Sequence, residues 1–359
     1  MRRAKSPYLP TWDFGPYRQT LARSRINVMS ATSPAPIVTL TMNPALDICA
    51  DADVVRPTDK IRCGSARYDA GGGGINVAKI AHVLGAPVTA VYPAGGPTGE
   101  VLTDLLIQGG VPVRRVQIGA STRESFTINE VSTGLQYRFV LPGPHLSFVE
   151  QQQCLADLRD AAAPARFVVA SGSLPPGAPV NFYQQVALIC RDLGVRLILD
   201  TSGGGLKHIT SGVYLLKASV RELRECVGRE LATESEQLDA AREIIDCGRA
   251  RAVVVSLGSD GALLVTSQGS LRFRAIPMRA LSGVGAGDAM VAAIAVGLSR
   301  DWSLSKSVRY GIASGAAMLM TPGTEPCTRA DAERLFEVAE LPLDIGGASR
   351  RAVEEALAR

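Results

Sequence analysis

The chain has 359 residues, of which 46% are hydrophobic and 20% charged, and its formal net charge is +4. This is ordinary globular composition, and the length suffices for one large α/β domain. The mild charge favours neither a nucleic-acid partner nor a membrane surface, and it is compatible with anionic substrates. No apolar run approaches the ~20 residues that a membrane-spanning helix needs.

The cysteines and histidines argue against a disulfide framework or a zinc enzyme. The seven cysteines are scattered without a C-x-x-C pair, and the three histidines share no spacing with them. An odd, scattered set is typical of a protein in a reducing compartment. We therefore expect a cytoplasmic protein without a structural metal.

The two ends of the chain are predicted to lie outside the fold. Residues 1–35 carry several arginines and prolines, show no sustained periodicity, and lack the apolar stretch of a secretory signal. They are predicted to be a disordered tail, and translation starting at Met29 is an alternative. One domain is predicted over 36–341, followed by a C-terminal tail at 342–359.

From Ile37 onward, short β-rich apolar runs alternate with helix-length stretches. Runs that are apolar throughout are typical of strands covered on both faces, as in a parallel sheet. The predicted strands are 37–42, 88–92, 167–171, 196–200, 213–217 and 252–257. The predicted helices, with 3.6-residue spacing, are 74–85, 98–109, 147–162, 179–193 and 234–247. This alternation predicts a three-layer α/β/α sandwich with a mostly parallel central sheet.

Two regions, at 48–70 and 112–141, break this alternation. They contain short segments of alternating polarity, of which 125–131 and 135–141 are joined by a Ser-Thr-Gly turn. Alternation indicates one covered and one exposed face. We predict a small antiparallel sheet that projects from the domain as a lid. Its apolar face needs a cover, so we expect a homodimer in which two lids pack together.

The strongest chemical signal is the segment SGVGAGD (282–288), which runs directly into an apolar, alanine-rich helix. Glycines present bare backbone N–H groups, and a helix N-terminus carries about half a positive charge, which suits an anion. Asp288 lies in the first turn, within reach of a hydroxyl group to be deprotonated. A transferring phosphoryl group needs both features, namely donors for its oxygens and a base in line with the nucleophile.

Other interpretations of this segment are less consistent with the sequence. An aspartate at a helix start is most often only a cap. A dinucleotide-binding motif would need an acidic residue closing a following strand ~20 residues on, and a Walker A loop would need G-K-[ST]. The companion segments favour phosphoryl transfer over a simple cap.

Two companions lie near the beginning of the domain. The segment DAGGGGIN (69–76) opens a helix, and its four glycines indicate either a flexible loop or a close approach of the backbone to a ligand. Asn76 can both donate to and accept from a polyol. Asp47 follows the first strand, where ligands of α/β sheets gather; it is either an ordinary turn aspartate or a ligand for two sugar hydroxyls.

The third companion is a set of cations in the predicted lid, Lys60, Arg123 and Arg138. Each one alone is typical of a solvated surface charge. Together they suit a substrate phosphate, which arginine can bind bidentately.

In this order the segments resemble the ribokinase-like sugar kinases, also called the phosphofructokinase B family, from about Ile37 to about Glu340. The motifs that carry the resemblance are TLTMNPALD, GGGGINVAKIAHVLG, YPAGGPTGE, TRESFTI, QYRFVLPG, VASGSLPPG, LILDTSG, VVVSLGSDGALL and SGVGAGDAMVAA. The resemblance implies the ribokinase-like fold and ATP-dependent phosphorylation of a sugar phosphate. The likeness is greatest to the bacterial members that convert fructose 6-phosphate and MgATP to fructose 1,6-bisphosphate.

The resemblance also implies a role for particular residues. Asp288 would be the catalytic base, and the backbone of Gly285, Ala286 and Gly287 would form the anion hole. Substrate binding is implied for Asp47, Gly72, Gly73, Asn76 and Ser171, with Arg123 and Lys60 near the substrate phosphate. Binding of ATP and Mg²⁺ is implied for Lys217, Ser219, Glu222, Ser256, Gly258 and Gly261. A monovalent cation, potassium in the family, would be bound by Ser282, Val284, Met318, Thr321 and Gly323.

The chain departs from the family at one corner of this site. Ser219 stands where the family often has the asparagine of Asn-x-x-Glu, which puts nucleotide or metal affinity there in question, whereas Glu222 is present. Alternative activities are 1-phosphofructokinase and tagatose 6-phosphate kinase, because substrates that differ by one hydroxyl configuration are separated by modest energies. A non-catalytic nucleotide or sugar-phosphate sensor on the same fold is a further alternative.

Overall fold

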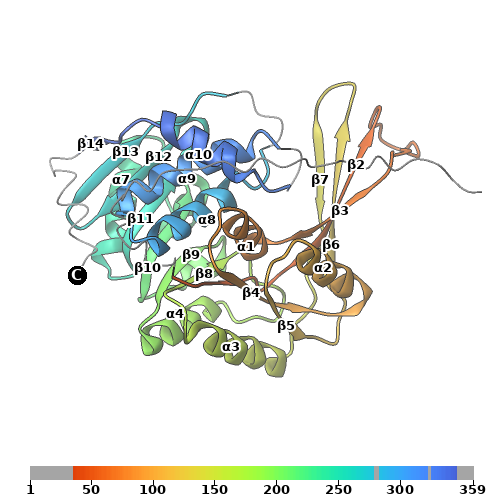
Figure 1. Ribbon diagram of the computed structural model, residues 1–359, viewed down its shortest axis with the longest axis horizontal. Coiled ribbons are helices and arrows are strands. Elements are labelled where there is room, and N and C mark those ends of the chain that lie inside the picture. Colours follow the sequence, from red (N-terminus) through yellow and green to blue (C-terminus); the bar gives the residue numbers. More distant parts are fainter. Residues whose placement is uncertain (1–34, 279–282, 322–324, 346–359) are drawn as a thin grey trace, which may run out of the picture. The chain divides into compact units, whose positions relative to one another are not determined.

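A large, mostly parallel sheet forms the centre of the structure, a computed structural model that describes residues 35–278, 283–321 and 325–345 (Figure 1). In order across the sheet, the strands are β14 (Leu343–Ile345), β13 (Gly269–Phe273), β12 (Ala262–Thr266), β11 (Ala250–Ser256), β10 (Val213–Ser219), β9 (Arg196–Asp200), β8 (Phe167–Ser171), β1 (Ile37–Leu40), β4 (Val88–Ala94) and β5 (Val113–Gln117). The strands from β11 to β5 are parallel, whereas β12, β13 and β14 pair antiparallel. The six strands predicted from apolar runs are confirmed, because each lies inside the sheet and is buried on both faces.

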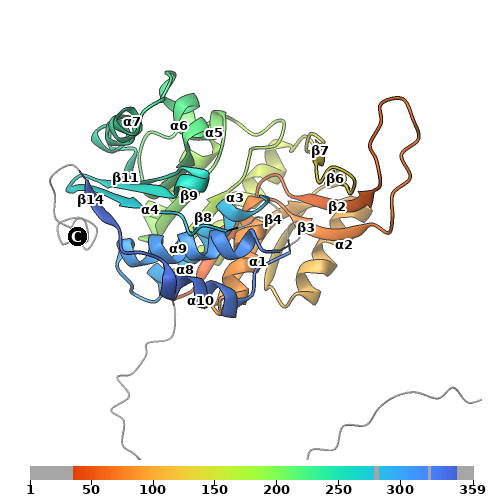
Figure 2. The same ribbon diagram turned by 90° about the horizontal axis from the view of Figure 1, so that it is seen from above.

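Helices cover both faces of this sheet (Figures 1 and 2). One face carries α1 (Gly73–Val83), α2 (Gly96–Gln108), α8 (Ala286–Ser299), α9 (Leu304–Met318) and α10 (Arg329–Val338). The other carries α3 (Phe148–Ala162), α4 (Phe182–Leu193), α5 (Gly204–Lys207), α6 (Val220–Val227) and α7 (Glu234–Asp246). A 3₁₀ turn, η1 (Gly258–Asp260), follows β11. Side chains alternate between two cores, as strand geometry requires: Phe167 of β8 belongs to the first and Val168 to the second.

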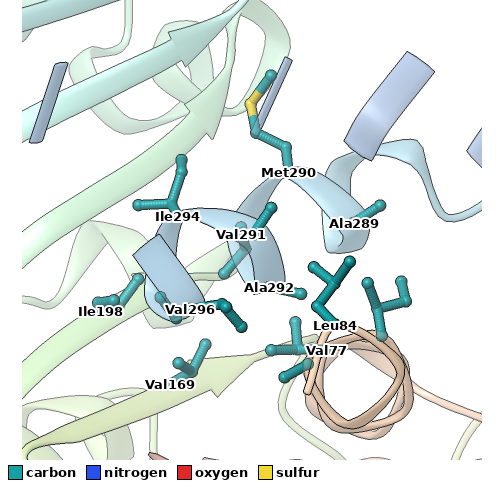
Figure 3. Packing of buried hydrophobic residues seen from close by; sticks show 14 of the residues in the cluster. Val77, Leu84, Val169, Ile198, Ala289, Met290, Val291, Ala292, Ile294 and Val296 are labelled. Atoms are coloured by element: carbon teal, nitrogen blue, oxygen red, sulfur yellow. The ribbon is translucent and has the colours of Figure 1, made fainter. Parts of the chain in front are cut away.

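Helix α8 is enclosed on all sides. Every residue from Ala289 to Ser299 is buried. Figure 3 shows Val291 and Ala292 of this helix close to Val77 of α1, with sheet residues on the other side. Such a helix has little freedom to shift within a close-packed core. The fold therefore holds the first turn of α8, which carries Asp288, in a fixed place.

The predicted lid exists as a separate sheet in the order β3-β2-β6-β7, formed by β3 (Arg67–Gly71), β2 (Ala45–Ala52), β6 (Arg123–Glu130) and β7 (Gln136–Val140). Strands β6 and β7 form the predicted hairpin, and β2 pairs antiparallel with β3. However, β2 and β6 are parallel, so the prediction of an antiparallel sheet is wrong at this pair. The chain reaches β6 from β2 through the main domain, and such a long connection permits a parallel pair.

Two predicted boundaries are also wrong. Strand β5, placed within lid segment 112–141, pairs with β4 at the edge of the main sheet. β5 contains polar residues because it is an edge strand, and edge strands often carry charged side chains. Arg114 and Arg115 form ion pairs with carboxylates of α3 and α2, respectively. Residues 343–345, placed in the C-terminal tail, form β14 on β13. The remaining tail residues, 1–34 and 346–359, lie outside the described residues.

The sequence analysis did not predict several elements, namely β12, β13, α5, α6, α9 and α10. In the part of the chain that the structure describes, no helix combines the length and the apolar character needed to cross a membrane.

Candidate active site

The start of α8 gathers positive charge at the carboxyl edge of the parallel strands. Gly285 caps the helix in the left-handed conformation (φ 81°), which residues with a side chain rarely adopt. Lys217, near the end of β10, lies against the first turn of α8, because a Cβ atom on Gly287 would come within 3.0 Å of the Lys217 Nζ. Backbone N–H groups of a helix start and a buried ammonium therefore converge where an anion would be stabilised.

Asp288 lies beside this positive charge, in the first turn of α8. Its Oδ2 accepts a 2.9 Å hydrogen bond from the Nδ2 of Asn76 in α1. Burial, with help from the nearby Asp200 carboxylate, raises the pKa of Asp288 to about 7, against the opposing effects of Asn76 and Lys217. A carboxyl with a pKa near neutrality is suited to exchange a proton with a substrate.

A buried ion pair lies beneath Asp288. The Nζ of Lys217 is 3.1 Å from Oδ2 and 3.2 Å from Oδ1 of Asp200, and both residues are less than a tenth exposed. Burial opposes the ammonium form, but the carboxylates of Asp200, Glu222 and Asp288 raise the pKa of Lys217 overall. Lys217 therefore stays charged beneath the first turn of α8.

The four glycines at 71–74 form a close-packed turn. Gly72 is the N-cap of α1 and has a φ of 114°. A Cβ atom on Gly73 would lie 2.3 Å from the Oγ of Ser171, the last residue of β8. The alternative of a flexible loop is therefore wrong. This packing brings Ser171 to the start of α1 and sets Asn76 on its first turn, facing Asp288.

Asp47 occupies the other side of the site, in lid strand β2. It lines a narrow cavity together with Asp69, Arg138 and Val284. Burial raises the pKa of Asp47 to about 6, although the positive charges of Lys79, Arg123 and Arg138 oppose this effect. Asp47 is therefore mainly ionised at neutral pH and is available as a hydrogen-bond acceptor.

Arg123, the first residue of β6, is held near Asp47 by backbone groups. Its guanidinium donates to the carbonyl oxygens of Leu141 at 3.0 Å and Asn43 at 3.1 Å. Its Nε is buried and has no hydrogen-bond partner among the described residues. Since a buried donor without a partner is costly, this Nε marks a place for a further acceptor.

A second and larger cavity, of about 660 Å³, opens on the opposite side of the α8 start. Part of its wall consists of small residues from the end of β11, the turn after it and the α8 start, namely Ser256, Gly258, Ser259, Gly261, Gly283, Ala286 and Gly287. Its remaining wall is apolar and includes Ile276, Met278, Met290, Ile312 and Leu319. Both the size and the apolar wall suit a flat ring such as a nucleotide base.

Ser219 and Glu222 are bound to each other in a capping box at the start of α6. The Glu222 carboxylate accepts from the Ser219 backbone N–H at 2.8 Å and from its Oγ at 2.7 Å, and the Glu222 N–H donates to that Oγ. In place of the family's amide, the serine therefore restrains the glutamate side chain.

Some residues predicted for the site are not brought into it. Lys60 is exposed in the loop between β2 and β3, beside Asp59 and Ile61 and away from the residues that line the Asp47 cavity. Of the predicted cation ligands, Ser282 and Gly323 lie outside the described residues. Met318 packs against the start of α8, where a Cβ on Gly285 would be 2.9 Å from its Cε.

Two polar residues of the site had not been assigned a role from the sequence. Asp200 ends strand β9, next to Lys217 on β10. Lys79 lies one turn after Asn76 on α1, donates to the carbonyl oxygen of Ala70 and has its charge near Asp47 and Asp69. Asp200 could have been found from its place at the carboxyl end of a strand. Lys79 carried no such signal, because a lysine on a helix is usually exposed.

No group of three or more histidine, cysteine, aspartate or glutamate side chains within 35–278, 283–321 and 325–345 is placed to hold a metal ion.

Comparison with known proteins identifies this arrangement. Residues 40–331 match the model of the pfkB family of carbohydrate kinases. The chain is 68% identical, over 86% of its length and 91% of the relative's, to the ATP-dependent 6-phosphofructokinase isozyme 2 of Mycobacterium tuberculosis. It is similar to the crystal structure of phosphofructokinase-2 from Escherichia coli in complex with potassium, with a TM-score of 0.82 and 38% identity over 85% of this chain and 99% of that one. A ribokinase of Arabidopsis thaliana, solved with ribose and ATP, shares the fold with a TM-score of 0.68 and 21% identity over 85% of this chain and 99% of that one. The chain has the ribokinase-like fold and belongs to the pfkB family of carbohydrate kinases.

Proposed function

We propose that this chain phosphorylates fructose 6-phosphate to fructose 1,6-bisphosphate with ATP. One observation carries the proposal: residues at the start of α8 line two cavities. Val284 lines the narrow cavity that holds Asp47, whereas Gly283 and Ala286 line the larger one. A sugar in the first and a nucleotide in the second would meet beside Asp288. The relatives named 6-phosphofructokinase support fructose 6-phosphate as the sugar.

In the proposed reaction, Asp288 removes the proton of the accepting hydroxyl. The oxygen forms a bond to the terminal phosphorus of ATP, and the bond to the bridging oxygen breaks to release ADP. Asn76 orients the carboxylate through its 2.9 Å hydrogen bond. The charge on the transferring phosphoryl oxygens is stabilised by the N–H groups at Gly285–Gly287 and by Lys217.

Substrate recognition is assigned to the lid side of the site. Asp47 accepts hydrogen bonds from sugar hydroxyls, with Asn76 and the backbone around Gly72, Gly73 and Ser171 completing the sugar site. Arg123 offers its buried Nε to the substrate phosphate, and Arg138 lines the same cavity. Lys60 would join them only if its loop, or that of a second copy, closed over the phosphate.

ATP is proposed to lie in the larger cavity, with its phosphates near Lys217 and the start of α8. Asp200 and Glu222, whose charges interact, supply carboxylates that suit Mg²⁺ brought by the nucleotide. When bound, Mg²⁺ neutralises charge on the phosphate oxygens. Potassium takes carbonyl and hydroxyl oxygens, which Val284, Met318 and Thr321 can offer. The Met318 carbonyl already accepts from the Thr321 hydroxyl at 2.9 Å, so it would serve both groups.

The lid is also proposed to form a homodimer. In register across the lid, Tyr68, Ile48, Phe126 and Phe139 form one apolar row over four strands. Tyr68 is 49% and Phe139 54% exposed. Packing two such faces together would remove this apolar surface from water. Light scattering at micromolar concentration tests the proposal, and a monomer there would contradict it.

The test of the activity is ADP release with a panel of sugars. We expect fructose 6-phosphate to give the highest kcat/KM, with fructose 1-phosphate and tagatose 6-phosphate well below. Preference for either of the other two would assign one of the alternative kinases. ATP binding without turnover on any phosphorylated sugar would favour the sensor. The matched control is Asp288→Asn, which should lower the signal by ~10²-fold or more if it arises at this site.

A further inference from the structure

A further cavity, distinct from the two at the active site, has a volume of about 730 Å³ and lies at the opposite edge of the main sheet. It is formed where strands β9, β10 and β11 begin, whereas the active site uses the residues where these strands end. Strand β10 has seven residues, so roughly 20 Å separates its two ends. The cavity is therefore distinct from the site described above.

Its floor is made by three neighbouring strand starts. Arg196 is the first residue of β9, Tyr214 the second of β10 and Arg251 the second of β11. The register pairs Val213 with Ala250, which sets Tyr214 beside Arg251. Since neighbouring strands lie about 4.8 Å apart, the two arginines start about 10 Å from each other, with Tyr214 between them.

No described carboxylate pairs with the two arginines of this floor. Arg196 lies over the ring of Tyr214 at 4.9 Å, and neither Arg196 nor Arg251 forms an ion pair with a described carboxylate. Arg191, also in the wall, has Asp192 at 3.7 Å and lies in the last turn of α4, where it offsets the negative helix end. Arg196 and Arg251 therefore remain to attract an anion.

Tyr214 adds a hydrogen-bond donor to this floor. The residue is only 7% exposed, and its hydroxyl makes no hydrogen bond to any described residue. Burial raises the pKa of Tyr214, and the charges of Arg196, Arg166 and Arg251 oppose this, so the hydroxyl stays protonated as a donor among cations. Ser267, exposed in the turn between β12 and β13, adds a second hydroxyl to the wall.

We propose that this cavity binds a small organic anion with two or more charged groups, such as a phosphorylated or polycarboxylate metabolite. Arg196 and Arg251 each bind one charged group, because guanidinium forms bidentate contacts with phosphate and carboxylate. Tyr214 donates to the portion between them. The separation of the two arginines favours an anion with two charged groups over an ion with one.

The experiment measures binding of citrate and of inorganic pyrophosphate to the full chain by calorimetry, with sodium chloride at matched ionic strength as the reference. We expect at least one of the two to bind and to raise the melting temperature by about 2 °C or more. Which of them binds decides between a carboxylate and a phosphate ligand. Arg196→Gln/Arg251→Gln should weaken that binding about 10-fold or more. Arg242→Gln/Arg334→Gln removes the same charge from the surfaces of helices α7 and α10 and should leave the binding unchanged.

A second pair of measurements distinguishes anion binding in this cavity from turnover at the candidate active site. Asp288→Asn should lose turnover but keep the anion binding, whereas Arg196→Gln/Arg251→Gln should keep turnover. If the arginine pair does not fold, Ser267→Asp places a repelling carboxylate in the wall and should weaken binding in the same way. The proposal is wrong if neither probe binds the unmodified chain, or if binding is equal in the chain and in its cavity variants.

Discussion

Asp288 at the start of α8 and Asp47 on the lid are two half-buried carboxyls on opposite sides of one site. Burial raises the pKa of both, to about 7 for Asp288 and about 6 for Asp47. Their neighbours differ: Asp288 has the like charge of Asp200 and the opposite charge of Lys217 nearby, whereas Asp47 has the like charge of Asp69 and the opposite charges of Lys79 and two arginines. In the proposed reaction, the carboxyl with the higher pKa takes the proton and the other binds hydroxyl groups.

Neutralising each carboxyl in turn tests whether Asp288 and Asp47 have different roles. Asp288→Asn should keep the fold, because the amide has the same shape, and should lower kcat by ~10²- to 10⁴-fold through loss of the base. Asp47→Asn should act mainly on KM for the sugar. Steady-state kinetics with fructose 6-phosphate distinguish the two. The reverse pattern, with kcat carried by Asp47, would show that the roles are exchanged.

The next largest effect is expected beneath Asp288. Lys217→Met leaves the Asp200 carboxylate buried without its partner, which should lower the free energy of unfolding by about 3–5 kcal/mol. Urea titration measures this loss. The double variant Asp200→Asn/Lys217→Met removes the buried charge and should recover part of the stability. Equal losses in both variants would mean that the ammonium stabilises the fold by packing alone.

On the lid side, Arg123→Ala should raise KM for fructose 6-phosphate about 10- to 100-fold, because hydrogen bonds to a charged phosphate are worth about 1.5–3 kcal/mol. KM for ATP should change little. Lys60→Ala is the contrast, since Lys60 is exposed away from the cavity and should have a small effect. A large effect of Lys60→Ala would show that the lid loop reaches the phosphate in the working enzyme.

The pH dependence of kcat/KM also tests the roles of the two carboxyls. Asp288 is active when ionised, so kcat/KM should fall about 10-fold for each pH unit below its pKa of about 7. Asp47 should add a second protonation below about pH 6, steepening the decline. In Asp47→Asn the decline should keep a single slope down to pH 5. A flat profile between pH 5 and 8 would contradict the role of Asp288.

The smallest effect is expected at the capping box. Ser219→Asn restores the residue that the family often has, and asparagine also caps helices well, so stability should change by less than about 0.5 kcal/mol. Because Glu222 loses the hydroxyl that restrains it, KM for MgATP should change by only a few fold. A large gain in turnover would show that the serine limits this enzyme.

The layered α/β fold and the place of the proposed catalytic carboxyl could be predicted from local sequence patterns. Short, β-rich apolar runs are typical of strands inside a covered sheet, so six strands followed from local pattern. Likewise, the glycines before Asp288 and the alanines after it specify a helix start that receives an anion, because these residues allow close backbone approach and a buried helix.

Which distant residues meet became clear only from the folded chain. The Asp200–Lys217 pair and the hydrogen bond between Asn76 and Asp288 join elements that the sequence leaves far apart. The edge strands β5 and β14 were also not predicted as parts of the main sheet. Because an edge strand is partly exposed, its sequence is more polar or alternating than that of a buried strand, and β5 was assigned to the lid and β14 to the tail. The physical reason is common to both: burial and charge at a residue are set by neighbours from other segments, and no local pattern carries that information.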